Sequence, residues 1–128
     1  MTQQLKSELR LRAKSFRFAF SGWWYVLRTQ RNAWIHALIS TAVIILSAWL
    51  RLPASDWALL ILTMVVVWMA EFANTALEAL VDMTMPAPHP LARVAKDVSA
   101  AAVLVGALGA ALIGVLLLGP PLWQRLIG

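Results

Sequence analysis

The chain has no cysteine and few charged residues, which make up 13% of its 128 positions. Without cysteine it can form no disulfide and no thiolate metal site. Hydrophobic residues make up 61% of the chain, which is too apolar for a soluble domain of this length, and the length is too short for more than one domain. The first 15 residues are polar and no short apolar stretch with a cleavage site follows, so we expect no cleavable signal peptide. The composition predicts one domain, residues 1–128, built into a membrane.

The formal net charge of +5 comes mostly from one end of the chain. Seven of the 11 Lys and Arg residues lie in residues 1–31, just before the first long apolar run. This clustering favours a segment at a membrane surface over a nucleic-acid-binding surface, so we expect no nucleic-acid partner. Residues 4–28 have the period of an amphipathic helix that lies in the membrane interface. Its basic and polar line comprises Arg10, Lys14, Arg17, Ser21 and Arg28, and its apolar line comprises Leu9, Phe16, Phe20, Trp23 and Leu27.

Three apolar runs, residues 33–50, 57–81 and 98–118, are predicted to be transmembrane helices. The first two are joined by a short turn containing Pro53, and we expect Ser55 or Asp56 to cap the second helix. Three prolines in residues 83–90 predict an extended loop, with Pro90 in the first turn of the last helix. Residues 119–121, Gly-Pro-Pro, are predicted to end that helix. The fold class is therefore an all-α membrane protein with three transmembrane helices and an N-terminal surface helix.

Lys and Arg also predict the orientation. Residues 1–31 and the loop in residues 82–97 together hold nine of them, against Arg51 and Arg125 on the other side. Because cytoplasmic loops carry the excess of Lys and Arg, the N-terminus and the proline loop are predicted to be cytosolic. Within the last span, Ala102, Gly106, Ala110 and Gly114 form a ridge of small residues, which lets helices approach closely in lipid.

Four polar residues interrupt the second span: Glu71, Asn74, Glu78 and Asp82. Offsets of 3, 7 and 11 place them within roughly an 80° arc of one helix. Carboxylates at membrane depth are costly, so this stripe favours a functional site facing the protein interior. The alternative is an interhelical polar contact that only holds a bundle together. His36, near the start of the first span, is interpreted as an interfacial or packing residue.

A second polar cluster, Arg93, Lys96 and Asp97, opens the last helix and is predicted to meet the stripe on the cytosolic side. Acidic residues beside basic ones suit a metal-bound phosphate compound, because Mg²⁺ takes one or two carboxylates and completes its shell with phosphate oxygens and water. The chain has no glycine-rich phosphate loop of the known nucleotide-binding types. The residues alone therefore indicate metal or phosphate chemistry in a membrane, without identifying a reaction.

Two linked motifs identify a family. They are Glu71-x-x-Asn74-Thr75-Ala76-x-Glu78-Ala79-x-x-Asp82 and His89-Pro90-Leu91-Ala92-x-x-Ala95-Lys96-Asp97, with Arg31-Asn32-x-x-Ile35-His36 upstream. Together they resemble the bacterial integral-membrane diacylglycerol kinases, a family that includes undecaprenol kinases. The resemblance implies a homotrimer in the bacterial cytoplasmic membrane that uses Mg²⁺ and ATP to phosphorylate a lipid alcohol at the cytosolic face.

The same resemblance implies roles for individual residues. Glu71 matches the catalytic base, and Asn74 matches a residue that orients the reacting groups. Glu78 matches a metal-binding carboxylate, and Lys96 a residue that contacts the phosphates of ATP. The positions in or near the nucleotide site are Asp82, His89 and Asp97.

One position departs from the family pattern. Gln30 stands where the family usually carries a Glu that shares the metal with Glu78, and Trp34 replaces a commonly basic residue. Gln keeps a carbonyl ligand but loses the charge, which predicts weaker Mg²⁺ binding. We expect an ATP-dependent lipid kinase. The alternatives are a non-catalytic membrane protein that keeps the kinase fold with an impaired metal site and, more distantly, a small transporter with a proton-relay stripe.

Overall fold

The computed structural model describes residues 2–128 and, within them, every side chain but those of residues 2, 4 and 6. The described chain forms four α-helices: α1 (Thr2–Thr29), α2 (Arg31–Leu50), α3 (Ala54–Thr84) and α4 (Pro90–Ile127). The last three are long and apolar enough to cross a membrane. The predicted all-helical fold with three apolar spans is therefore confirmed.

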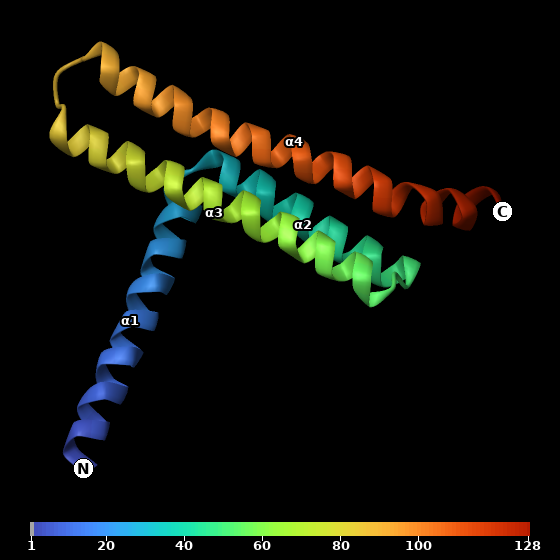
Figure 1. The fold of residues 1–128 in the computed structure, drawn as a ribbon, viewed down its shortest axis with the longest axis horizontal. Coiled ribbons are helices and arrows are strands. Elements are labelled where there is room, and N and C mark those ends of the chain that lie inside the picture. The colour runs from blue at the N-terminus through green and yellow to red at the C-terminus, as the bar shows by residue number, and fades with distance from the viewer. Residues whose placement is uncertain (1) are drawn as a thin grey trace.

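The helices α2, α3 and α4 run side by side, and α1 leaves the bundle at a steep angle (Figure 1). The corner between α1 and α2 is the single residue Gln30, whose backbone is extended at φ −104° and ψ 114°. The α3–α4 loop lies at the same end of the bundle as this corner, and the α2–α3 turn lies at the opposite end. The long hairpin of α3 and α4 makes most of the contacts between helices.

The turn after α2 differs from the prediction. Arg51 adopts the left-handed conformation with φ 56°, and the Leu52 N–H donates to the Ser47 carbonyl at 3.2 Å, which closes the end of α2. Pro53, rather than Ser55 or Asp56, precedes α3, and its carbonyl accepts from the Asp56 N–H at 3.1 Å. The predicted cap was therefore wrong, because the fixed φ of Pro53 lets it precede the helix two or three residues before the expected side-chain caps.

The predicted end of the last helix was also wrong. Pro90 does lie in the first turn of α4, but α4 continues through Pro120 and Pro121 to Ile127. Proline removes backbone hydrogen bonds, yet spanning helices tolerate it where neighbouring groups compensate. Here the Arg125 guanidinium lies 5.4 Å from the ring centroid of Trp49, near the end of α2, and this contact supports the added turns.

The core of the single chain is small and unusually polar. Most large apolar side chains of the described residues are exposed, as expected for helices surrounded by lipid or by other protein chains. Among the described residues, the largest fully buried side chains are Glu71 and Ser47. Glu71 is 1% exposed, and its chain neighbour Phe72 packs against Trp23 of α1, so Glu71 lies at the level where α1 meets the bundle. An aromatic cluster of Trp23, Trp68 and Phe72, with ring centroids 5.5–5.7 Å apart, holds α1 against α3 at that level.

Candidate active site

Two polar pockets lie at the end of the bundle that carries the α1–α2 corner and the α3–α4 loop. The inner pocket has a volume of about 300 Å³. Its polar lining comes from α3, from the start of α2 and from the corner before α2, and includes Gln30, His36, Glu71, Asn74 and Glu78. The outer pocket, of about 600 Å³, lies under the α3–α4 loop, and its polar lining comprises Asp82, His89, Arg93, Lys96 and Asp97. The structure thus divides the predicted site residues into two neighbouring groups.

Helix α3 connects the two pockets. Glu71, Asn74 and Glu78 recur at the period of the helix and all line the inner pocket, whereas Asp82, one turn further on, lines the outer pocket. Helix geometry places Glu71 and Asp82 about 16 Å apart along the axis. The stripe predicted from the sequence is therefore one continuous polar face that runs from the loop end of α3 into the bundle.

Two amide side chains hold the Glu78 carboxylate. Gln30 Nε2 donates to one oxygen at 3.0 Å, and Asn74 Nδ2 donates to the other at 3.1 Å. Gln30 reaches Glu78 because its extended backbone turns the chain from α1 into α2 beside α3. Both carboxylate oxygens are therefore fixed in position, and each retains a lone pair on its open side.

Asn74 is itself held from the opposite side. The hydroxyl of Ser99 on α4 donates to Asn74 Oδ1 at 2.6 Å and lies 2.9 Å from the carbonyl oxygen of Lys96. Asn74 is 7% exposed, so this contact sets the direction of its amide. The sequence analysis did not identify Ser99. Its offset of three from Lys96, on the same helix face, is the signal that could have found it.

Glu71 lies deepest in the inner pocket, beside His36. His36 Nε2 on α2 is 3.8 Å from Glu71 Oε2, beyond hydrogen-bond distance but within electrostatic reach. Neither Glu71 oxygen nor His36 Nε2 has a hydrogen-bond partner among the described residues. The interpretation of His36 as an interfacial or packing residue is incomplete, because His36 also faces the site. Its ring packs edge-on to Trp68, with centroids 6.4 Å apart.

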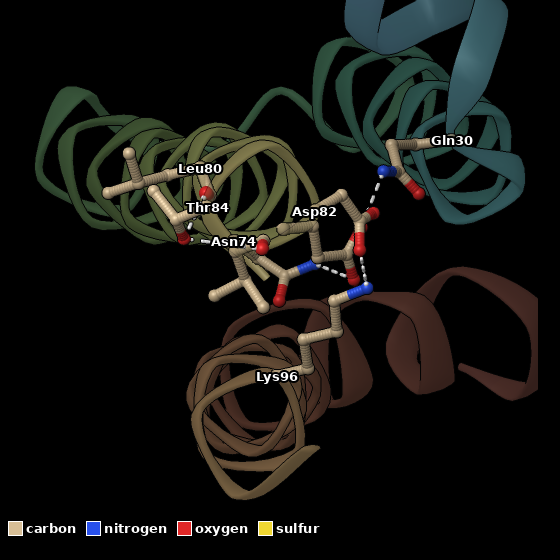
Figure 2. A network of polar contacts seen from close by, with 8 residues as sticks. Gln30, Asn74, Leu80, Asp82, Thr84 and Lys96 are labelled. Carbon is tan, nitrogen blue, oxygen red and sulfur yellow. Dashed lines mark hydrogen bonds and ion pairs between the residues drawn. The ribbon is translucent and has the colours of Figure 1, made fainter. Parts of the chain in front are cut away.

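Charge pairs dominate the outer pocket. Lys96 Nζ on α4 contacts Asp82 Oδ1 on α3, and Arg93 Nε lies 3.8 Å from Asp97 Oδ2 one turn away on α4. Figure 2 shows Gln30, Asp82 and Lys96 reaching from three segments of the chain toward the space between them. His89 caps α4, because its Nδ1 accepts from the Leu91 N–H at 3.2 Å. The cationic groups of this pocket are solvent-accessible and suit an anionic ligand.

The side chains of this site can bind a divalent cation only if a bound phosphate compound supplies further oxygen ligands. Among residues 2–128 no group of three His, Asp or Glu side chains is close enough together to bind a metal by itself. Glu78 and the amide oxygen of Gln30 supply one carboxylate and one carbonyl. That is the partial shell that Mg²⁺ accepts when phosphate oxygens and water complete it. The residues therefore fit Mg²⁺ delivered with a phosphate compound, and they do not form a complete metal cage.

Comparison with known proteins shows which family the chain resembles. Residues 17–118 match the family model described as prokaryotic diacylglycerol kinase. The chain is 44% identical over 114 residues to a diacylglycerol kinase of Synechocystis sp., covering 88% of this chain and 65%, just under two thirds, of that protein. It is 38% identical over 117 residues to the undecaprenol kinase of Bacillus subtilis, covering 91% of this chain and 95% of that protein. The diacylglycerol kinase of Escherichia coli K12 is 31% identical over 101 residues, covering 73% of this chain and 83% of that protein.

Proposed function

The chain belongs to the prokaryotic diacylglycerol kinase family, and we propose that it transfers the γ-phosphoryl group of ATP to the hydroxyl of a membrane lipid alcohol. The acceptor is diacylglycerol or undecaprenol, the two lipid alcohols that appear in the relatives' names. The observation that carries the proposal is the polar face of α3, which joins a cation-bearing pocket at the loop end to a buried carboxylate in the bundle that has no hydrogen-bond partner among the described residues. Transfer from a water-soluble nucleotide to a membrane-bound lipid requires such a path.

The outer pocket receives the nucleotide. Lys96 offsets negative charge on the phosphates, which phosphoryl transfer requires of a cation beside the transferred group. Asp82 keeps the Lys96 ammonium close to α3, where the polar face begins. His89, Asp97 and the loop after α3 form the remaining wall, so they contact the nucleotide outside its triphosphate. Glu78 and the Gln30 amide oxygen would hold the Mg²⁺ that accompanies ATP, and the ion would offset charge on the phosphates. Gln30 directs its amide nitrogen at Glu78, so the amide group would have to rotate to present its oxygen to the ion.

The chemistry takes place between Glu78 and Glu71. The lipid hydroxyl loses its proton to the Glu71 carboxylate as its oxygen bonds to the γ-phosphorus. The bond from that phosphorus to the bridging β–γ oxygen breaks, and ADP leaves. Asn74 lies between the two glutamates on α3 and is fixed by Ser99, so its amide orients the reacting groups. A hydroxyl anchored by apolar chains reaches Glu71 because that residue is the deepest of the stripe.

The assembly and the orientation belong to the same proposal. The family resemblance supports a homotrimer, and the many exposed apolar side chains of the single chain are compatible with contacts between copies. The excess of Lys and Arg in α1 and in the α3–α4 loop region supports a cytosolic position for that end of the bundle. Both polar pockets then open toward the compartment that supplies ATP.

Phosphoryl transfer can be measured directly. Purified protein in mixed micelles receives γ-labelled ATP, Mg²⁺ and either diacylglycerol or undecaprenol, and the labelled lipid phosphate is counted. We expect label on at least one lipid with the wild-type chain and at least 100-fold less with Glu71→Gln. Asp56→Asn is the matched control, because it makes the same chemical change at the far end of α3. Absence of label on both lipids with the folded wild-type chain would favour the non-catalytic alternative.

A further inference from the structure

Glu71 is buried without a compensating hydrogen bond. Its residue is 1% exposed, and neither carboxyl oxygen has a hydrogen-bond partner among the described residues. Burial away from water disfavours the ionised form of a carboxyl group, and charge at membrane depth is costly. Only the ionised form can accept a proton from a hydroxyl, so a base at this position needs a positive charge beside it.

Few groups around Glu71 can carry a charge. On α3 the nearest is Glu78, two turns away, and its negative charge opposes the ionisation of Glu71. Where α1 packs against α3, its large side chains are uncharged at neutral pH: Trp23, Tyr25 and Val26. The α4 residues that line the inner pocket are also uncharged: Ala100, Val103, Leu104 and Ala107. Among the described residues that line this pocket, His36 is therefore the one that can be positive.

His36 faces Glu71 from α2, and its ring is held in that direction. Its Nε2 lies 3.8 Å from Glu71 Oε2, and the ring packs edge-on to Trp68. Trp68 belongs to the aromatic cluster with Trp23 and Phe72, so the packing of α1 on α3 also fixes the imidazole. The His36 side chain is 13% exposed, which leaves it able to exchange a proton with water in the inner pocket.

We propose that His36 is protonated on both ring nitrogens and that its positive charge keeps the Glu71 carboxylate ionised. The inference rests on the proposed function, in which Glu71 is the base, and gives a role to a buried residue that the mechanism does not otherwise use. A neutral imidazole would offer at most a hydrogen bond, and 3.8 Å is beyond that distance, whereas attraction between opposite charges extends over it. His36 is then a positioning residue, which acts on the reaction through Glu71.

Infrared spectroscopy tests the ionisation of Glu71 without any transfer reaction. A protonated carboxyl group has a C=O stretch that an ionised carboxylate lacks, and the part due to Glu71 is the part removed when Glu71→Gln is added to the same protein. Wild-type protein in detergent at neutral pH, without nucleotide or lipid, should show no such band from Glu71. His36→Leu should produce the band, and so should His36→Gln, which keeps an N–H donor but carries no charge. His36→Lys, which restores a positive charge, should lack it.

The matched control is His89→Gln, which makes the same change at the other histidine of the chain and should leave the Glu71 band absent. His36→Gln keeps a polar side chain at the position, so it carries the test if His36→Leu does not fold. A Glu71 band in the wild-type protein would overturn the proposal. Its absence from the folded His36→Gln variant would overturn it as well.

The pH dependence of turnover supplies a second measurement. At neutral pH, the kcat of His36→Gln should lie about tenfold or more below that of the wild type, with the KM for Mg-ATP little changed. The loss should shrink as the pH rises, because Glu71 then ionises without the neighbouring charge. A loss of the same size at every pH would show altered packing and would overturn the proposal. The expected infrared result from a wild-type protein that labels neither lipid would support the charge pair and count against the proposed function.

Discussion

The side-chain amide of Gln30 donates to the Glu78 carboxylate at 3.0 Å, across 48 positions of the sequence. This contact ties the α1–α2 corner to α3 at the entrance of the inner pocket. It also explains how a neutral residue is accommodated where the family pattern has an acid, because the amide N–H group pairs with the carboxylate.

Replacement of Gln30 by Glu tests this relationship. Gln30→Glu places a second carboxylate against Glu78, and like charges at that distance repel unless a cation lies between them. We expect the thermal midpoint of the variant to fall without Mg²⁺ and to recover when Mg²⁺ is added. The Mg²⁺ concentration for half-maximal activity should fall below that of the wild type. A Mg²⁺ dependence that is unchanged or weaker would show that Gln30 is not at the metal position.

Substitution of the two glutamates of the stripe, Glu71 and Glu78, is expected to have different effects on turnover and on Mg-ATP affinity. They lie about 10.5 Å apart along α3, so one ion is not bound by both. Glu71→Gln should lower kcat by about 100-fold or more while Mg-ATP affinity is largely kept, because a base acts mainly in the transition state. Glu78→Gln should weaken Mg-ATP binding together with turnover. Nucleotide affinity and turnover are measured for both variants, and wild-type turnover by Glu71→Gln would refute the catalytic assignment.

We expect Ser99 to affect turnover through its hydrogen bond to Asn74. Ser99→Ala leaves Asn74 Oδ1 without its 2.6 Å donor, so the amide is free to turn away from Glu78. We expect kcat to fall about fivefold, with little change in the KM for lipid. Ser99→Thr keeps the hydroxyl and should retain most of the activity. Ser55→Ala, at the far end of α3, is the control, and equal activity of the Ser99→Ala and Ser55→Ala variants would count against the link.

The ridge of small residues on α4 lies close to α3 at Gly106. A Cβ at Gly106 would be in van der Waals contact with Val67 Cγ2 of α3 at 3.9 Å, so the further atoms of a leucine side chain there would crowd Val67. Gly106→Leu should therefore lower the stability of the α3–α4 hairpin by about 1–3 kcal/mol. Gly109→Leu, with no atom within 4 Å, should not. Thermal unfolding in detergent measures both, and equal midpoints would show that α3 and α4 do not pack closely at Gly106.

Topology provides the last prediction. With three spans and a cytosolic N-terminus, the C-terminus is external. A reporter active only outside the cytosol, fused after Gly128, should be active, and the same reporter inserted in the α3–α4 loop after Ala87 should be inactive. Reversed signals from the two fusions would overturn the proposed orientation, and matching signals would overturn the proposed three-span topology.

Much of the architecture followed from the sequence alone. Apolar runs of sufficient length predict helices wherever they occur, because backbone groups in lipid must be satisfied within the segment. The period of 3.6 residues placed Glu71, Asn74 and Glu78 on one face without any tertiary information. The ends of the helices were predicted less well. The prolines alone predicted that the last helix ends at Gly119, but α4 continues to Ile127, and its last turns include the contact of Arg125 with Trp49.

The partners of that polar face were decided only by the tertiary structure. Periodicity states which residues share a face of one helix, but it does not state how a neighbouring helix is rotated or shifted against that face. The contacts of His36 with Glu71, Ser99 with Asn74 and Gln30 with Glu78 each join two different segments of the chain. Helix packing sets those rotations through many small side-chain contacts, which no single motif encodes. The sequence by itself therefore determined which residues share the polar face of α3, and packing determined which residues of the other segments meet that face.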